Sequence, residues 1–432
     1  MSARNKAPTR AERAYGRPIA GSGLGERIPE LVAAWRESRR SEDSGPLTRR
    51  EIALAGASLF ALQRGLTGDR RLAGSRYMDD PDLLGAYLLY YWPVSYMQVS
   101  LAVAEFPLAH ASGSGPYRIL DLGSGPGPAS AAIIDAFCDV NGKARGEPPE
   151  LILADASRKA LDLAASILER GAPAKAHTAA LDLESSSPLP EGPFDLLVAG
   201  HCLNELWRGE SDALDRREAL LLRAAERLTP RGRILVLEPS LLSTSRELIA
   251  LRDRLAARSW RVIGPCLGSY PCPIFAAGEE RSCHAESTWE PPEIVAALAA
   301  TAGLDRDSVK CAYFFLQPGI EEGRDDADSG CLRVVSDPML NKAGRLRYHL
   351  CGAGALSTIS AKADDSAART AGFMSLSRGD LVRPISFEER EGGGLGFGPL
   401  SRLEIVRRAP EASPTKRAAP FKEGAASLDG AS

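Results

Sequence analysis

One short segment of the chain combines an acidic residue with three glycines at alternating positions. Asp121, Gly123, Gly125 and Gly127 lie at the end of the apolar run 118–122 and directly after it. Glycine lets a backbone turn sharply and approach a ligand closely, and a carboxylate at a strand end can bind a charged or hydroxylated group. The spacing therefore predicts a ligand-binding loop between a strand and the helix that follows it.

Two further acidic residues extend this pattern. The D-x-G-x-G-x-G spacing is associated with methyltransferases that use S-adenosylmethionine (SAM), whereas a dinucleotide site would read G-x-G-x-x-G. Asp155 ends the next apolar run, where a carboxylate can bind both ribose hydroxyls, and Asp182 ends the third, where an acid can accept from an adenine amino group. Each acid alone would more often be a turn or helix-cap residue. Together they predict a SAM site at Asp121, Gly123, Gly125, Gly127, Asp155 and Asp182.

The methyl acceptor is not identified by the sequence, and the catalytic residues stay unknown. The Asn/Asp-Pro-Pro-Tyr signature of amino-group methylation is absent after the fourth apolar run, 194–199. Cys202 could act as a thiolate nucleophile, but it lacks the preceding proline of such enzymes, so packing is favoured. His201, Asn204 and Glu205 could orient a substrate.

A second group of reactive residues follows downstream. Cys266, Cys272 and Cys283 fall within eighteen residues, two of them flanked by prolines. Three thiolates need a fourth ligand to complete an all-cysteine metal site. The candidates for that ligand are His284, Cys311, Cys331 and Cys351. Cys311 and Cys331 lie in apparent core strands, where packing is favoured, and His284 adjoins Cys283, so both side chains would rarely reach one metal. Cys351 ends an alternating strand and could fold back onto the insertion. The spacing alone is compatible with zinc and with an iron–sulfur cluster.

The elements that position these residues alternate from residue 117 onward as strand and helix, which predicts a parallel, doubly wound α/β sheet. We expect a strand at 331–336 to close this sheet, after an acidic loop at 320–329, and strands 345–351 and 355–361 to pair. The predicted organisation is a disordered basic tail (1–25), a helical domain (26–110), a SAM-binding domain (115–338) with a cysteine insertion (239–290), a small β-rich domain (339–408) and a disordered tail (409–432).

Composition narrows the functional class. Hydrophobic residues make up 44% and charged residues 25% of the 432, as in soluble globular proteins, and no apolar run could span a membrane. Without a secretory signal, the eight cysteines are expected to be reduced thiols or metal ligands. Residues 1–76 carry 15 basic and 8 acidic side chains, and residues 340–432 carry 14 basic and 10 acidic ones. The excess of acidic side chains therefore lies in the middle of the chain, between these two segments. Basic ends suit a polyanion, although solvated arginines explain them equally well.

The chain resembles the methyltransferase-like assembly factors of the small ribosomal subunit, found in bacteria and mitochondria. The resemblance covers about residues 80–390 and is carried by Trp92-Pro93, the glycine loop 120–127, Leu203–Leu206, Glu238-Pro239, Pro265-Cys266, Pro271–Pro273, Cys283-His284, Tyr313-Phe314, Leu350-Cys351 and Gly379-Asp380. It implies a class I SAM-methyltransferase (Rossmann-like) fold, a [4Fe–4S] cluster on Cys266, Cys272, Cys283 and Cys351 in preference to zinc, and association with small-subunit rRNA. The family usually has Cys-Pro-His at the first cysteine, where this chain has Cys266-Leu-Gly268.

These patterns predict a SAM-binding, [4Fe–4S]-containing methyltransferase or methyltransferase-like factor that acts on the small ribosomal subunit. One alternative is a non-catalytic RNA-binding assembly factor that uses the fold as a scaffold. Another is a small-molecule methyltransferase with a structural zinc. We expect a monomer in the cytoplasm, with the mitochondrial matrix as the alternative because the basic N-terminus resembles a transit peptide.

Overall fold

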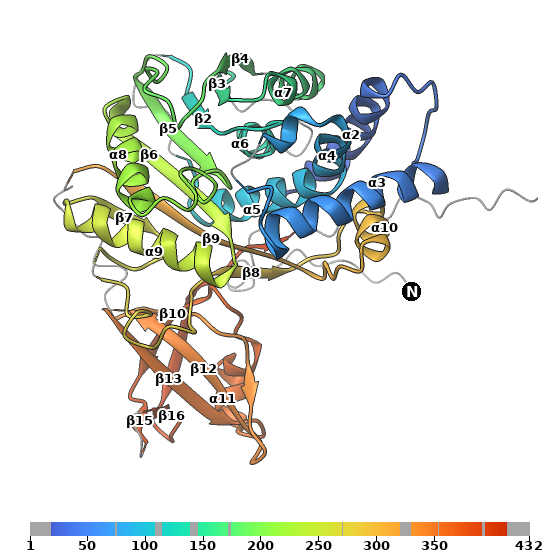
Figure 1. Cartoon of the computed structure of the whole chain (residues 1–432). Helices are drawn as coiled ribbons and strands as arrows, with labels where there is room; N and C mark the ends of the chain where they lie inside the picture. The colour runs from blue at the N-terminus through green and yellow to red at the C-terminus, as the bar shows by residue number, and fades with distance from the viewer. Residues whose placement is uncertain are drawn as a thin grey trace, which may run out of the picture.

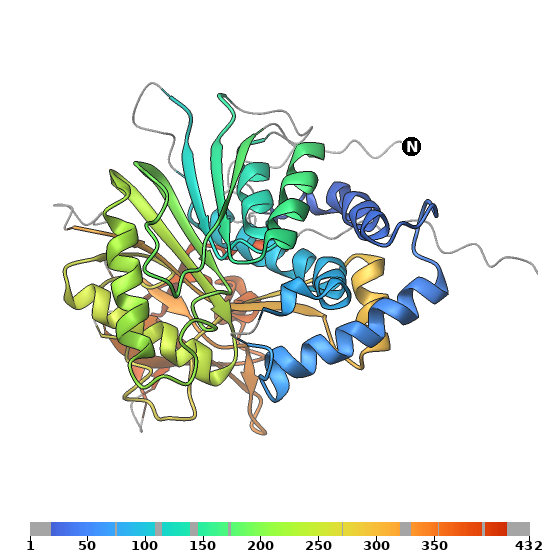
Figure 2. The same ribbon diagram turned by 45° about the horizontal axis from the view of Figure 1, so that its top comes forward.

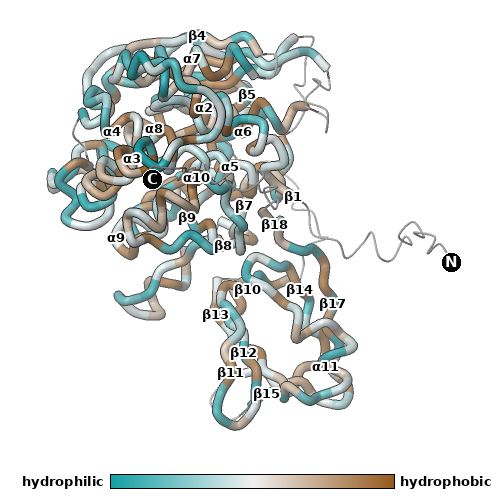
Figure 3. Tube along the Cα trace, turned by 90° about the vertical axis from the view of Figure 1, so that its right-hand side faces the viewer, coloured by the Kyte–Doolittle hydropathy of each residue, from teal (hydrophilic) through white to brown (hydrophobic). Residues whose placement is uncertain are grey.

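The computed structural model describes residues 19–73, 76–108, 115–138, 146–171, 174–269, 271–319, 330–352, 354–390 and 394–412. A central sheet flanked by helices forms the main body, and a second sheet projects from it, as two views at right angles show (Figures 1 and 3). The predicted acidic loop at 320–329 and most of both predicted tails lie outside the described residues.

The central sheet has the strand order β4-β3-β2-β5-β6-β9-β7, with β8 paired to β9. Its strands are β2 (Arg118–Leu122), β3 (Glu150–Asp155), β4 (Lys175–Ala180), β5 (Phe194–Gly200), β6 (Leu228–Pro239), β7 (Arg261–Gly264), β8 (Ala285–Thr288) and β9 (Ser308–Gln317). All neighbours from β4 to β6 are parallel, and β9 runs antiparallel to both β6 and β7. A doubly wound sheet with one antiparallel strand in this position is the class I methyltransferase topology, so the predicted fold class is confirmed.

Helices cover both faces of this sheet, because its strands are apolar on both sides. Helices α6 (Pro128–Ala136) and α7 (Arg158–Arg170) lie on one side, and α8 (Ala213–Ala225) and α9 (Leu242–Ala257) lie on the other (Figure 2). Each layer of helices packs on the sheet through a hydrophobic core of its own. The core on the side of α6 and α7 contains Ile133 and Leu161, and the core on the side of α8 and α9 contains Leu220 and Leu248.

An N-terminal group of helices extends the first layer. It consists of α2 (Leu24–Ser38), α3 (Arg49–Gln63), a π-helical turn (Arg64–Gly68), a 3-10 turn η2 (Tyr77–Asp79), α4 (Pro81–Ala86), a π-helical segment (Tyr87–Tyr91) and α5 (Trp92–Glu105), with α10 (Glu293–Thr301) packed beside α3. Thr48 and Glu51 form a capping box that fixes the start of α3. Pro93 lies in the first turn of α5. It lacks an N–H donor, and the turn before it is widened into the π-helical segment.

The second sheet has the order β15-β16-β13-β12-β10-β14-β17, with β11 at the edge of β12. Its strands are β10 (Leu332–Val334), β11 (Met339–Leu340), β12 (Arg345–Gly352), β13 (Ala355–Lys362), β14 (Leu381–Ile385), β15 (Glu388–Glu389), β16 (Leu395–Gly396) and β17 (Arg402–Arg407), with a short helix α11 (Ser366–Thr370). The predicted pairing of 345–351 with 355–361 is confirmed by the β12–β13 register. The expectation that 331–336 closes the central sheet is wrong, because β10 lies between β12 and β14, and the second sheet therefore begins before residue 339.

Two other predicted boundaries differ from the structure. The segment 239–290 is not wholly an insertion: α9 buries Leu248 and Leu255 against the sheet, and β7 is the sheet's last strand. The longest part of it without helix or strand is 265–284, in which the structure describes every residue except 270. Residues 19–25 and 409–412, which were predicted to belong to the two tails, are described by the structure. Strand β1 (Ile19–Ala20) pairs in parallel with β18 (Glu411–Ala412), which orders both ends of the described chain beside α5 and β8. No helix in the described ranges has the length and apolar character needed to cross a bilayer.

Candidate functional site

A cavity of about 730 Å³ lies at the carboxyl edge of the central sheet. Ligands of doubly wound α/β proteins bind at this edge, where loops after parallel strands meet. The floor is made by the residues that follow β2, β3, β4, β5 and β6, and the N-terminal helices and the segment before β9 form the remaining walls. The volume lies in the upper part of the range for a single drug-sized ligand, which leaves room for a second group.

The glycine loop has the conformation that its sequence predicts. Gly123, Gly125 and Gly127 have φ values of +65°, +51° and +77°, in the left-handed region that favours glycine. A Cβ at Gly123 would lie 2.5 Å from the Cβ of Cys202, so no larger residue fits there. The indole N–H of Trp92 donates to the carbonyl of Pro126 at 2.9 Å, which connects α5 to the loop.

The three predicted acidic residues have different environments. Asp155 lines the cavity, and its two carboxylate oxygens accept from the backbone N–H groups of Gly125 and Ser157, both at 2.8 Å. Burial raises its pKa. Asp182 lies exposed at the rim and accepts from the N–H of Glu184. Each carboxylate oxygen still has a lone pair for a ligand hydroxyl or amino group.

Asp121 lies behind the loop and does not line the cavity. One of its oxygens accepts from the Ser130 hydroxyl at 2.7 Å, and the other has no hydrogen-bond partner in the described part of the chain. Burial raises its pKa to about 7. Gly123, Asp155 and Asp182 therefore come together in the cavity wall, whereas Gly125, Gly127 and Asp121 shape it from behind.

The residues after β5 form the far half of the cavity. His201 has φ +61° and contacts Gln98 of α5, with 2.7 Å between Nε2 and Oε1. The Cys202 thiol donates to the carbonyl of Leu122 at 3.2 Å, and burial raises its pKa well above the ordinary value, which disfavours a thiolate nucleophile. Asn204 is held by Glu238, which accepts from both its backbone and side-chain nitrogens.

Sequence reasoning missed two parts of this cavity. The 3-10 turn η2 places Met78 against the glycine loop, and Asp79 in the same turn accepts from Ser157 at 2.8 Å. Gln98 lies 103 residues from His201 along the chain, so no local pattern could indicate their contact.

The four predicted cysteine ligands come together where the two sheets meet. Cys266, Cys272 and Cys283 lie in the loop 265–284 and pack against the second core of the main body, whereas Cys351 lies on β12 of the second sheet. In Figure 1 this yellow loop runs from the main body down to β10. The pKa of Cys272 is raised to about 11, and the pKa values of Cys283 and Cys351 are raised to about 12. Burial is the largest cause, and the neighbouring thiols of the set contribute to the same rise.

A long part of the chain matches a protein family by sequence. The family is described as the mitochondrial small ribosomal subunit protein Rsm22, and its sequence model matches residues 83–362, which is more than half of the chain. The chain belongs to the Rsm22 family. This confirms the resemblance to methyltransferase-like small-subunit factors. The match to the Rsm22 family includes the glycine loop and all four cysteines, but it leaves out Met78 and the helices α2 and α3.

Comparisons with other proteins add little to the Rsm22 assignment. No curated protein sequence matches the chain. Among solved structures, a putative class I SAM-dependent methyltransferase from Listeria monocytogenes is 10% identical with a TM-score of 0.32, covering 70% of this chain and 88% of its own. A SAM-dependent methyltransferase from Leishmania major is 14% identical with a TM-score of 0.31 (72% and 100% covered), and one from Clostridium acetobutylicum is 15% identical with 0.25 (37% and 54%). At these scores the fold assignment rests on the strand order, not on the similarity.

The residues around the cysteines of this Rsm22-family chain suit a negatively charged group. In the described ranges no three His, Cys, Asp or Glu side chains lie close enough to hold one metal ion. A four-iron cluster spaces its thiolates farther apart than a single ion does, because each thiolate binds a different iron. Arg252 donates a hydrogen bond to Cys266. Arg333 is the register partner of Cys351, and its Nε and Nη2 groups are buried with no hydrogen-bond partner among the described residues.

Proposed function

We propose that this protein binds SAM in the cavity of its central sheet and acts on the rRNA of the small ribosomal subunit, as a methyltransferase or methyltransferase-like assembly factor. One observation carries the proposal: a left-handed glycine loop and the Asp155 carboxylate form one cavity wall, joined by the bond from the Gly125 N–H. Close backbone approach and a buried carboxylate are what an adenosyl ligand with a charged amino-acid end requires. The family description supports the ribosomal partner.

Each part of the wall would have a distinct role. SAM, when bound, supplies an electrophilic methyl group. Asp155 accepts from the ribose hydroxyls, and Asp182 at the rim accepts from the adenine amino group. The glycine loop admits the amino-acid end, and the N-terminal residues Tyr77 and Met78 cover the ligand from above. Catalysis then depends on holding the acceptor in line with the methyl group.

The test of SAM binding is the substitution Gly125→Val. Valine is strained at φ +51°, and its Cβ would lie 3.1 Å from Cε of Met78. We expect affinity for S-adenosylhomocysteine, measured by calorimetry, to fall by about 10- to 100-fold. The matched control is Gly344→Val in the second sheet, where φ is +69° and no atom lies within 4 Å of a new Cβ.

The same variant separates the proposal from its alternative. Unchanged ligand affinity in Gly125→Val would contradict the site. If affinity is lost but small-subunit assembly in cells proceeds at the normal rate, the protein is a non-catalytic assembly factor that uses the fold as a scaffold.

We further propose that Cys266, Cys272, Cys283 and Cys351 hold a [4Fe–4S] cluster rather than zinc. The support is the grouping of all four partly buried thiols in one region and the buried N–H groups of Arg333 that have no hydrogen-bond partner among the described residues. A cluster held in this way would join the loop 265–284 to the second sheet, which is a structural role.

Anaerobic purification tests the cluster. We expect a brown protein with about four irons per chain, and loss of both colour and iron in Cys351→Ala. Cys311→Ala is the control, because Cys311 is a buried thiol of β9 that lies outside the set. A colourless protein with one tightly bound zinc would contradict the proposal.

The partner and the compartment follow from the same family assignment. We propose that the protein binds small-subunit rRNA directly. The word mitochondrial in the family description favours the matrix over the cytoplasm, and localisation of the tagged full chain by microscopy tests this.

A further inference from the structure

His201 lines the cavity of the proposed SAM site. It follows the last residue of β5, and its backbone N–H donates to Leu237 of β6 at 2.7 Å. Its left-handed φ of +61° is costly for a residue with a Cβ, and such strain is retained where surrounding structure holds a side chain in a defined place. The imidazole ring is thereby fixed in the cavity wall, beside the other residues that follow β5.

The hydrogen bonds of Gln98 determine which imidazole nitrogen carries the proton. The Gln98 Nε2 group lies 2.7 Å from the backbone oxygen of Lys310, and a carbonyl can only accept. The amide oxygen of Gln98 must therefore face His201 Nε2, so Nε2 must be the donor. Burial lowers the pKa of His201 to about 4, so the ring is neutral at physiological pH and Nδ1 carries a lone pair.

That lone pair is available to a ligand. No hydrogen bond to His201 Nδ1 occurs in the described ranges, and Nδ1 is not among the fully buried unpartnered atoms, so it is accessible from the cavity that the ring lines. The thiol of the adjacent residue, Cys202, is occupied with the Leu122 carbonyl.

We propose that His201 Nδ1 accepts a hydrogen bond from the methyl acceptor, and that this acceptor is the exocyclic amino group of a nucleobase. This inference rests on the proposed SAM site. The amino nitrogen forms the bond to the methyl carbon while the sulfonium sulfur keeps the electron pair of the bond that breaks. The proton then leaves the nitrogen for Nδ1 and passes to water.

The weakness of this base selects the acceptor. An amino group on a heteroaromatic ring becomes a strong acid once it is alkylated, so a weak neutral imidazole is able to take its proton. A ribose hydroxyl would have to lose its proton earlier, to a much stronger base. Methylation of a pyrimidine carbon would need a free thiolate, which Cys202 does not provide.

The first measurement is the tautomer. In the full-length protein labelled with [15N]histidine, five imidazoles contribute nitrogen–proton correlations. We expect the correlations of one imidazole, which should be missing from the spectrum of His201→Gly, to show a protonated Nε2 and an unprotonated Nδ1 at pH 7. Glycine removes the ring while tolerating the left-handed backbone. In Gln98→Leu, which keeps the ring but removes its partner, the two tautomers should be mixed. A protonated Nδ1 in the unaltered protein would overturn the inference.

The second measurement uses matched nucleotides with S-adenosylhomocysteine present. CMP and UMP differ at one position in having an amino group or an oxygen, as do AMP and IMP. We expect the amino nucleotide of each pair to shift the His201 Nδ1 resonance and to bind about 3- to 10-fold more tightly, a preference lost in His201→Gly. An equal response within both pairs, or no response to any nucleotide, would overturn the inference. Neither measurement needs rRNA or turnover, so a failure of the proposed ribosomal function would be seen separately.

Discussion

At the scale of single residues, the carboxyls of Asp121 and Glu238 are buried and form no ion pair with any described residue. Asp121 and Glu238 are each about 1% exposed, and burial raises their pKa values to about 7 and about 8. In Glu238 both oxygens accept from Asn204, whereas one oxygen of Asp121 has no hydrogen-bond partner among the described residues. Asp121 is therefore the better residue for measuring how much a buried carboxylate lowers the free energy of unfolding.

The folded protein should lose stability as pH rises through the pKa of Asp121. Because this pKa is raised from 3.8 to about 7, the folded state binds more protons than the unfolded state between these values. The contribution of Asp121 is full below pH 4 and lost above pH 7. We expect Asp121→Asn to be more stable than the unaltered protein by about 2 kcal/mol at pH 5 and by about 4 kcal/mol at pH 8, in urea unfolding without ligand. A difference of the same size at both pH values would contradict this.

At the scale of elements, one ion pair joins the main body to the second sheet. Arg333 of β10 pairs with Glu105 at the end of α5, and both side chains are less than 10% exposed. Glu105 also accepts from the Tyr313 hydroxyl at 2.7 Å, and Arg333 donates to the Gly379 carbonyl at 2.7 Å. The contact between the two sheets therefore depends on a few buried polar groups as well as on the cysteine loop.

Breaking this pair from one side should destabilise the protein. Arg333→Met leaves the Glu105 carboxylate buried and unpaired, which costs about 3–5 kcal/mol. The double variant with Glu105→Gln should recover part of that loss in urea unfolding. If it recovers none, the loss comes from the cysteine site and not from the pair. The control is Arg216→Met, whose partner Asp212 is exposed and which should leave stability unchanged.

The same scale shows what the sequence could and could not predict. The glycine loop, Asp155 and the β12–β13 hairpin depend on local spacing and alternation, and these were predicted correctly as elements. Strand β10 was assigned to the wrong sheet, because a run of three residues does not encode which of two sheets it joins. The contact of Gln98 with His201 joins residues 103 positions apart, and only the folded chain reveals it.

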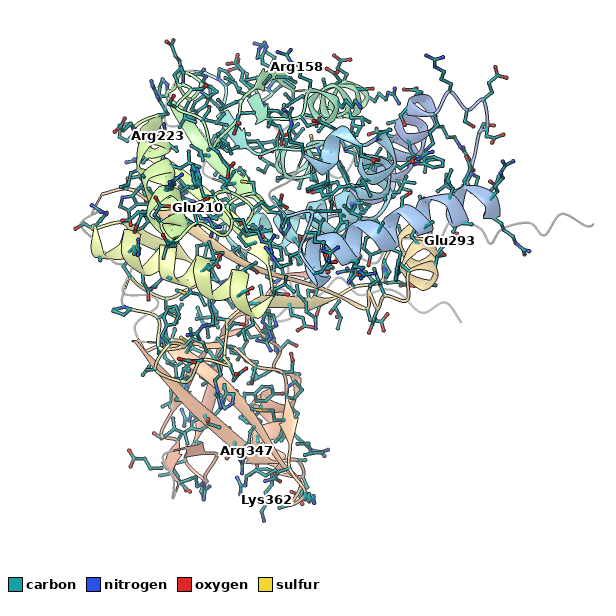
Figure 4. The ribbon with its side chains drawn as sticks, viewed as in Figure 1. Arg158, Glu210, Arg223, Glu293, Arg347 and Lys362 are labelled. Carbon is teal, nitrogen blue, oxygen red and sulfur yellow. The ribbon has the colours of Figure 1, made fainter. Side chains whose placement is uncertain are left out.

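At the scale of the whole molecule, basic side chains lie at both extremes. Arg347 and Lys362 lie at the distal end of the second sheet, and Arg158 and Arg223 lie at the opposite end of the main body (Figure 4). All four are exposed. The distal end also carries the exposed apolar side chains of Met339 and Leu340. Basic and apolar groups on one strand ribbon are typical of a surface that binds nucleic acid.

Charge reversal at the distal end should weaken RNA binding in a salt-dependent way. For the double variant Arg347→Glu and Lys362→Glu, we expect the slope of log affinity against log salt to become less steep by about 1.5, since each phosphate contact contributes about 0.7–0.9. The measurement is filter binding to small-subunit rRNA between 50 and 200 mM salt, values at which this effect is large. The charge-matched control is Arg158→Glu with Arg223→Glu. An equal change in the control would mean that only net charge matters.

The pairing of Ile19–Ala20 with Glu411–Ala412 has a consequence for biosynthesis. A chain emerging at about 5–20 residues per second makes its first strand roughly 20–80 s before the strand that pairs with it. During that interval the start of the chain has no mate, and Ala412 is not yet available to donate to Ser287. The two ends can therefore pair only after translation has passed residue 412. A prematurely terminated product would carry β1 without its partner strand, and quality-control proteases could recognise it.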